Sequence, residues 1–168
     1  MEPLVSIIMG SISDMPVMEG AAKILNDFKI PFEIHALSAH RTPLEIEKFA
    51  LGAESRGIKV IIAAAGMAAH LPGVIASLTP LPVIGVPIKA SLEGLDSLLS
   101  IVQMPSGIPV ATVGINAAQN AGILAAQIIA AGNPEVAKEI SKFKQELKKK
   151  VVQANDELKT VKFPYKTN

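Results

Sequence analysis

Five short apolar runs alternate with helix-like segments along the first 131 residues of the chain. The runs are bounded by Gly, Pro and Ser, as is typical of buried strands, and occupy residues 4–9, 32–37, 58–65, 82–86 and 108–113. Helices are predicted at residues 14–28, 43–56, 70–78, 93–104 and 117–131. Repeated strand–helix–strand units imply right-handed crossovers and a parallel sheet with helices on both faces. The pattern predicts a single-domain, three-layer α/β/α sandwich.

The second helix carries the clearest local signals for its ends. Thr42-Pro43-Leu44-Glu45 has the form of a capping box, with proline at the first helical position. Gly57 follows the last residues of the helical pattern, where glycine commonly stops a helix. We therefore expect the helix to begin at Pro43 and to end before Gly57.

A last helix is predicted at residues 134–158, outside the core at residues 4–132, and a loose or docking tail follows it. Apolar residues recur at spacings of three and four, so that one stripe faces a partner surface; they are Val136, Ile140, Phe143, Leu147 and Val151. Lysines cover the other side. This lysine face is either a solvated surface or a contact for a polyanion.

The near-zero net charge of +1 conceals two regions. Residues 1–134 hold seven cationic and ten anionic side chains, whereas residues 135–168 hold nine lysines and five acids. A body without a basic face disfavours nucleic-acid binding. There is no apolar run of ~20 residues for a membrane span, no secretory signal pattern and no cysteine. We expect a cytoplasmic protein without disulfides or thiolate metal sites.

Charge is scarce in the middle of the chain. Between residues 60 and 134 the only charged side chains are Lys89, Glu93 and Asp96. A domain of 168 residues leaves much of its surface exposed. This stretch predicts extensive contacts between subunits; the alternative is a surface that is merely uncharged.

Polar residues that a core does not require follow the first three predicted strands. Ligands of open α/β sheets bind at the carboxyl ends of the strands. The candidates are Ser11, Ser13 and Asp14 after the first strand, Ser38, His40 and Arg41 after the second, and Gly66, Ala69, His70 and Leu71 after the third.

The first of these loops suits an anion such as a phosphate. Gly10 allows close backbone approach, two hydroxyls follow it, and a helix start supplies free N–H groups. An ordinary helix cap by Ser13 or Asp14 explains the same residues equally well. The dinucleotide fingerprint and the P-loop are both absent, which argues against NAD or nucleoside triphosphates bound in those modes.

The second loop combines an arginine with a histidine. Arg41 is a planar donor suited to a phosphate or carboxylate, and the other arginine, Arg56, is explained by a helix end. His40 is a candidate for proton transfer, because imidazole has an ordinary pKa near ~6.5. His35 lies inside a strand as a packed or surface residue, and His70 either orients a ligand or caps a helix.

The residues that several other kinds of active site require are absent from the sequence. No group of side chains has metal-ligand spacing, and the G-x-S-x-G motif of serine esterases is missing. The loops contain no aromatic residue to stack on a flavin, and no aspartate ends the third strand as in a phosphoacceptor domain. What remains fits a small phosphorylated metabolite handled by acid–base chemistry without a cofactor or metal.

The motifs G-S-x-S-D, S-A-H-R-T-P and A-A-H-L-P-G occur in this order, and the chain resembles the N5-carboxyaminoimidazole ribonucleotide mutases from about residue 5 to 131. The resemblance implies a flavodoxin-like doubly wound sheet, a homo-octamer and no cofactor. It also implies migration of a carboxylate from the exocyclic nitrogen of an aminoimidazole ribonucleotide to its ring carbon, in purine (IMP) biosynthesis. An ATP-dependent carboxylating synthetase would supply this substrate.

The resemblance also assigns roles to the loop residues. Ser11, Asp14 and Arg41 would contact the ribose phosphate, and His40 would transfer the proton. Ser38 would close over the imidazole and carboxylate together with residues 66–71, which include Gly66, Ala69, His70 and Leu71.

Two alternatives stay open. A sister class carboxylates aminoimidazole ribonucleotide directly with carbon dioxide, but residues 68–73 favour the mutase. Met67 stands where many members have a second glycine. If its side chain blocked the pocket, the chain would be a catalytically silent ribonucleotide-binding subunit.

Overall fold

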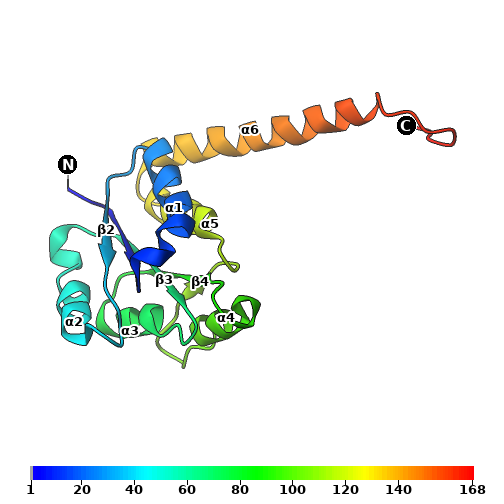
Figure 1. Cartoon of the computed structure of the whole chain (residues 1–168). Coiled ribbons are helices and arrows are strands. Elements are labelled where there is room, and N and C mark those ends of the chain that lie inside the picture. The colour runs from blue at the N-terminus through cyan, green and yellow to red at the C-terminus, as the bar shows by residue number, and fades with distance from the viewer. Residues whose placement is uncertain (1) are drawn as a thin grey trace.

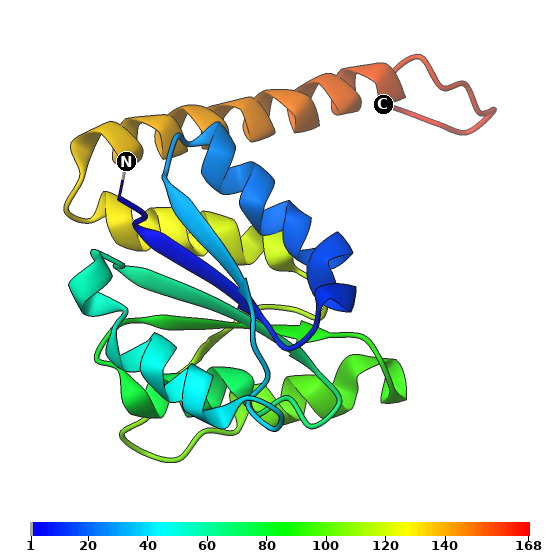
Figure 2. The same cartoon turned by 60° about the vertical axis from the view of Figure 1, so that its left-hand side comes forward.

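The computed structural model describes residues 2–168 and contains one parallel sheet of five strands in the order β2-β1-β3-β4-β5. Figures 1 and 2 show the strands running side by side through the middle of the body. The strands are β1 (Val5–Met9), β2 (Phe32–Ala36), β3 (Val60–Gly66), β4 (Val83–Ile88) and β5 (Ala111–Thr112). The order reverses between β1 and β3, as in a doubly wound flavodoxin-like sheet, so the predicted fold class is confirmed.

Helices cover both faces of the sheet. In Figure 2, α1 and α5 lie on one side of the strands and α2, α3 and α4 on the other. The helices are α1 (Met15–Asp27), α2 (Pro43–Leu51), α3 (Leu71–Leu78), α4 (Leu95–Val102), α5 (Ala118–Ala130) and α6 (Pro134–Leu158). Short 3-10 turns occupy Ile12–Asp14, Glu54–Arg56 and Leu92–Gly94.

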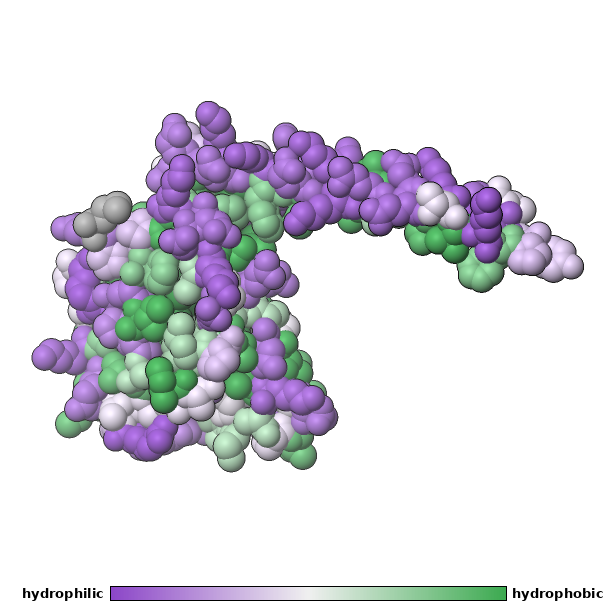
Figure 3. Space-filling model, turned by 45° about the horizontal axis from the view of Figure 1, so that its top comes forward, coloured by the Kyte–Doolittle hydropathy of each residue, from purple (hydrophilic) through white to green (hydrophobic). Residues whose placement is uncertain are grey.

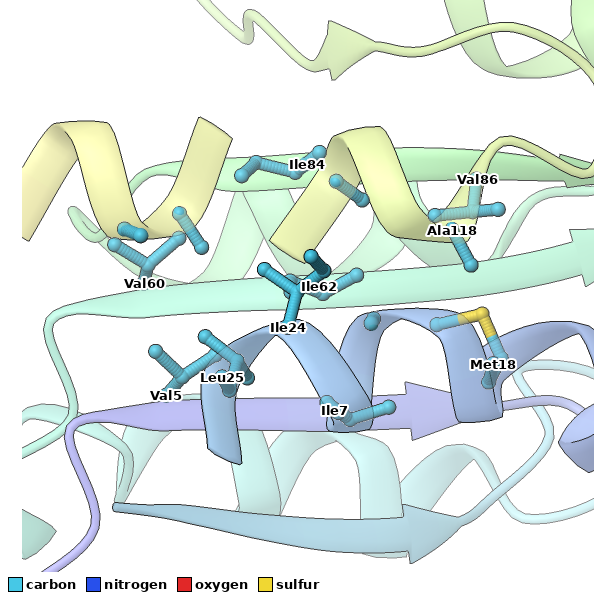
Figure 4. Packing of buried hydrophobic residues seen from close by; sticks show 14 of the residues in the cluster. Val5, Ile7, Met18, Ile24, Leu25, Val60, Ile62, Ile84, Val86 and Ala118 are labelled. Atoms are coloured by element: carbon cyan, nitrogen blue, oxygen red, sulfur yellow. The ribbon is translucent and has the colours of Figure 1, made fainter. Parts of the chain in front are cut away.

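Each central strand contributes to two separate cores, because its successive side chains point to opposite faces. On β1, Ile7 joins the core beneath α1 and α5, whereas Ile8 joins the core above α2, α3 and α4. Figure 4 shows the first core, where Ile62 and Ile84 from the sheet meet Ile24 from α1. Strands buried on both faces explain why they appear in the sequence as continuous apolar runs.

Two glycines permit close contacts that a larger residue would prevent. A Cβ on Gly122 of α5 would lie 3.0 Å from the carbonyl oxygen of Ala21 on α1, so these helices meet backbone to backbone. A Cβ on Gly85 of β4 would overlap the side chain of Ile101 on α4 and lie 3.0 Å from Val110 Cγ1. The α4 layer therefore sits directly on the sheet.

The predicted boundaries of the second helix are partly wrong. α2 begins at Pro43 but ends at Leu51, and a separate 3-10 turn leads to Gly57, whose φ of 88° marks the expected stop. The capping box does not form. Instead, the Thr42 hydroxyl donates to the Ser38 carbonyl and accepts from the Ser38 N–H, both at 2.9 Å. The Thr42 side chain therefore closes the loop that precedes α2 and does not cap the helix.

The fifth strand is shorter than predicted. It contains only Ala111 and Thr112, which pair with Ile84 and Gly85 of β4. Pro109, inside the predicted run, has no N–H to donate to a neighbouring strand. Pairing with β4 therefore begins only after Pro109.

The predicted last helix is present and projects from the body (Figure 1). Asn133 caps it by accepting hydrogen bonds from the N–H groups of Glu135 and Val136. The first part of its apolar stripe packs on the domain, where Phe143 meets Phe28 edge to face at 5.5 Å between ring centroids. The later part, with Leu147 and Val151, is exposed.

None of the helices in residues 2–168 combines the length and hydropathy needed to cross a membrane.

The contact between β4 and α4 can be tested by adding one methyl group. We expect Gly85→Ala to destabilise the protein by about 1–3 kcal/mol, because the new Cβ overpacks against fully buried Ile101. Gly132→Ala is the control, since no atom lies within 4 Å of a Cβ at that position. Urea unfolding of both variants measures the difference; equal midpoints would contradict this packing.

Candidate active site

The loops that follow β1, β2 and β3 meet in one cleft of about 440 Å³ at the carboxyl edge of the sheet. The cleft lies beside the point where the strand order reverses, and its volume falls within the ~300–1,000 Å³ typical of small-molecule sites. Nine of the ten predicted site residues line it: Ser11, Ser13, Asp14, Ser38, His40, Arg41, Gly66, His70 and Leu71.

Ala69 is the exception, and Ala90 is an addition. Ala69 is only 1% exposed and packs in the core beneath α2 and α3, so it does not line the cleft. Ala90 lines the cleft from the segment that follows β4. The position of Ala90 just after a strand could have marked it as a residue of the cleft. Its small apolar side chain, however, suggests no chemical role.

The first loop is organised around Ser11. The Ser11 oxygen accepts hydrogen bonds from the Ser13 N–H at 3.3 Å and from the Ser13 hydroxyl at 2.9 Å. Ser11 therefore caps the 3-10 turn before α1, rather than Ser13 or Asp14 as the capping alternative predicted. Both hydroxyls and the Asp14 carboxyl remain on the wall of the cleft.

Burial at the wall of the cleft shifts the pKa of Asp14. Burial raises the pKa of its carboxyl above the ordinary aspartate value, and hydrogen bonds from the Ser13 side chain and the Ser11 backbone offset part of this rise. The cleft therefore disfavours a bare negative charge at Asp14. A hydroxyl donor on a ligand would relieve this cost by solvating the carboxylate.

Arg41 joins the second loop to the first. Its Nη2 donates to the Gly10 carbonyl at 2.8 Å, while its backbone N–H lies 3.4 Å from the Ser38 hydroxyl oxygen that accepts from it. One edge of the guanidinium is thus held by the backbone of the neighbouring loop. The remaining N–H groups form a planar donor set at the cleft.

His40 and His70 make a direct hydrogen bond. His40 Nε2 lies 2.8 Å from His70 Nδ1, and the two rings are nearly perpendicular with centroids 5.0 Å apart. One nitrogen must donate and the other accept, so the pair can carry one added proton but loses this bond if both rings become imidazolium. The two histidines therefore form one unit that can hold a proton. The sequence alone suggested separate roles for them, proton transfer for His40 and ligand orientation or helix capping for His70.

The third loop places His70 through a sharp bend at Met67. Met67 has a left-handed backbone with φ of 55°, and the His70 N–H donates to the Ala68 carbonyl at 2.8 Å. This path directs Ala69 into the core and His70 toward His40. Met67 lines the cleft without closing it, since the cleft keeps its volume with this side chain in place.

The remaining histidine and arginine, His35 and Arg56, lie together away from the cleft. His35 on β2 and Arg56 each lie 3.2 Å from the Glu33 carboxylate, and both pack against the ring of Phe49. Burial alone would raise the pKa of Glu33, but hydrogen bonds from Ser6 and Arg56 and the charge of Arg56 hold it below the ordinary value. This cluster fastens β2 to α2.

Among residues 2–168, no group of three or more His, Asp or Glu side chains is arranged to hold a metal ion.

Comparison with known proteins identifies the family to which the chain is similar. The family model described as AIR carboxylase matches residues 4–150. An N5-carboxyaminoimidazole ribonucleotide mutase of Thermotoga maritima is 58% identical over 160 residues, which cover 95% of this chain and 94% of that protein. One from Pyrococcus horikoshii is 61% identical over 151 residues, covering 89% and 85%. The crystal structure of Treponema denticola PurE has a TM-score of 0.85 at 32% identity, covering 94% and 99%.

The raised pKa of Asp14 predicts a specific pH dependence of stability. A carboxyl whose folded pKa exceeds its unfolded value of ~3.9 stabilises the fold fully below that value, and this contribution is lost as the pH rises through the folded pKa. Asp14→Asn should therefore raise the free energy of unfolding of the ligand-free protein at pH 7. The gain should shrink to nothing below about pH 4. Urea titrations across this range measure it; a gain that grows toward acid pH would contradict the assignment.

Proposed function

The chain belongs to the AIR carboxylase family, and we propose that it isomerises N5-carboxyaminoimidazole ribonucleotide to the ring-carboxylated ribonucleotide in purine biosynthesis. The observation that carries the proposal is the His40–His70 pair, which lies in the same cleft as Arg41. The His pair supplies a group that can move a proton, and Arg41 supplies charge-assisted donors for the phosphate of a ribonucleotide. The similarity to relatives named as mutases supports the same reaction.

The ribose phosphate would occupy the side of the cleft formed by the loops after β1 and β2. Arg41 supplies charge-assisted donors there, and Ser11 and Ser13 supply hydroxyls. Asp14, whose carboxylate is poorly solvated, would accept from a ribose hydroxyl. Ser38 and the loop with Gly66 and Leu71 would contact the imidazole and its carboxylate.

His40 would move one proton in each direction. As the bond between the exocyclic nitrogen and the carboxylate carbon breaks, its electrons return to nitrogen, which takes a proton from the His40 imidazolium. This step leaves aminoimidazole ribonucleotide and carbon dioxide. The ring carbon then attacks carbon dioxide, and neutral His40 removes the proton from that carbon. His70 accepts or donates at the other end of the hydrogen bond, so the unit is restored after each turnover.

Two observations bear on the alternatives. Met67 leaves the cleft open, which favours an enzyme over a silent ribonucleotide-binding subunit. Residues 68–73 carry the motif that favours the mutase over a direct carboxylase. Product formed from the N-carboxylated substrate without added bicarbonate identifies a mutase, whereas a requirement for aminoimidazole ribonucleotide plus bicarbonate identifies a carboxylase.

His40→Asn tests the proton transfer. Asparagine keeps a polar group at this position but cannot carry the proton, so turnover of the N-carboxylated substrate should fall at least about a hundredfold. Formation of the ring-carboxylated product, followed by its absorbance, measures this loss.

His35→Asn is the matched control, because His35 lies in the Glu33 cluster and does not line the cleft. It should retain most of the activity. Wild-type turnover by His40→Asn would show that another group transfers the proton, and His70 would be the next candidate.

We further propose that the protein acts in the cytoplasm as a homo-oligomer, an octamer by family resemblance, downstream of an ATP-dependent carboxylating synthetase. Apolar side chains are exposed on α4, where Leu99 is 47% exposed, and on the projecting part of α6, where Val151 is 70% exposed. Figure 3 shows hydrophobic patches near the far end of this otherwise hydrophilic helix. A second copy of the chain would cover these surfaces.

Sedimentation tests the assembly. The protein should sediment at several times its chain mass of 17.6 kDa, and Leu147→Glu should shift it toward smaller species by placing a charge in the apolar stripe. Gln145→Glu is the control, because it adds the same charge on the opposite face of α6. A stable wild-type monomer at micromolar concentration would contradict the proposal.

A further inference from the structure

Met67 holds a backbone conformation that its residue type disfavours. Its φ of 55° lies in the left-handed region, where a Cβ approaches the following carbonyl oxygen. Residues in such conformations persist only where the surrounding structure imposes them, and they gather at functional sites. A glycine would adopt the same path without this cost.

The folded chain does not compensate the cost by packing the side chain. Met67 is 60% exposed and belongs to neither of the two cores. The residues around it in the loop are small, from Ala65 and Gly66 to Ala68 and Ala69. Met67 therefore contributes a large flexible side chain that the fold itself does not use.

The strand order places Met67 across the cleft from Asp14 and Arg41. The loops after β1 and β2 supply Asp14 and Arg41, whereas Met67 follows β3 and Ala90 follows β4 on the other side of the switch point, where His70 is the polar side chain. Gly66 lies against Ala90, since a Cβ at Gly66 would be 3.3 Å from that of Ala90. Apart from His70, this side of the cleft is lined by apolar residues, which are small except for Met67 and Leu71.

We propose that Met67 packs its thioether over the planar aminoimidazole of the bound ribonucleotide and shields the carbon dioxide formed during turnover. The proposal rests on the function proposed above. Methionine suits this role, because its unbranched side chain adapts to a ligand and its sulfur makes favourable contacts with aromatic rings. Excluding water from this side keeps a small apolar intermediate beside the ring carbon. Met67 is therefore a substrate-contacting residue that takes no part in proton transfer.

Three substitutions separate the side chain from the backbone. Met67→Leu keeps an apolar cover, Met67→Ala removes it but keeps the backbone cost, and Met67→Gly removes both. Met67→Gly should therefore unfold at a higher temperature than Met67→Ala, which shows that the backbone is left-handed in solution.

Two measurements then test the contact. The first is the affinity for 5-aminoimidazole ribonucleotide, measured by calorimetry. This affinity should fall roughly fivefold in Met67→Ala and Met67→Gly, because part of an apolar contact is lost. It should change little in Met67→Leu. The second is the fraction of N-carboxylated substrate released as 5-aminoimidazole ribonucleotide instead of ring-carboxylated product. This fraction should rise in Ala and Gly.

Unchanged affinity and unchanged release in Met67→Ala and Met67→Gly would overturn the proposal. So would a loss of sedimenting mass in these variants with unchanged affinity, because Met67 would then contact a second copy. Failure of the proposed function is distinguishable: the wild-type protein would make no ring-carboxylated product, while the affinity series would still report whether Met67 touches the ribonucleotide.

Discussion

The parallel register of β1 with its two neighbours is the constraint on which the site depends. Met9 pairs with Ala36 of β2 and with Ala64 of β3, so three strands reach the same edge of the sheet together. Backbone bonds extend the match beyond the strands: the Gly10 N–H donates to Ala64 and the Leu37 N–H donates to Met9. A slip of one residue would turn the side chains of these strands to the wrong faces and separate the loops.

This register brings residues that are far apart in the sequence into contact at the site. His40 and His70 are separated by 30 positions, yet their nitrogens lie 2.8 Å apart because β2 and β3 flank β1. Arg41 is fixed in the same way, by a carbonyl of the loop that follows β1. The rigid sheet therefore positions the proton carrier and the cationic donor relative to each other, and the loops need only short, self-closed turns such as Ser38–Thr42.

The sequence predicted the strands and helices that follow from hydrophobic periodicity. It did not predict features that depend on strand pairing, on side-chain hydrogen bonds or on the backbone angles of one residue. The central strands were found because both of their faces are buried, and most helices because one face of each is apolar. The fifth strand was overestimated since Pro109 cannot donate, and Thr42 was misassigned because its hydroxyl bonds to Ser38. The loops were located correctly by strand polarity, but the His40–His70 bond and the left-handed Met67 leave no signature in spacing or composition.

Amide hydrogen exchange with and without 5-aminoimidazole ribonucleotide tests most directly that the switch-point cleft is the substrate site. Slower exchange is predicted in residues 10–14, 38–42 and 66–71 together, because these loops form the walls of one cleft. The small cleft between α1 and α6, lined by Phe28 and Phe143, should not change. Protection confined to that second cleft, or absent from all three loops at saturating ligand, would contradict the account.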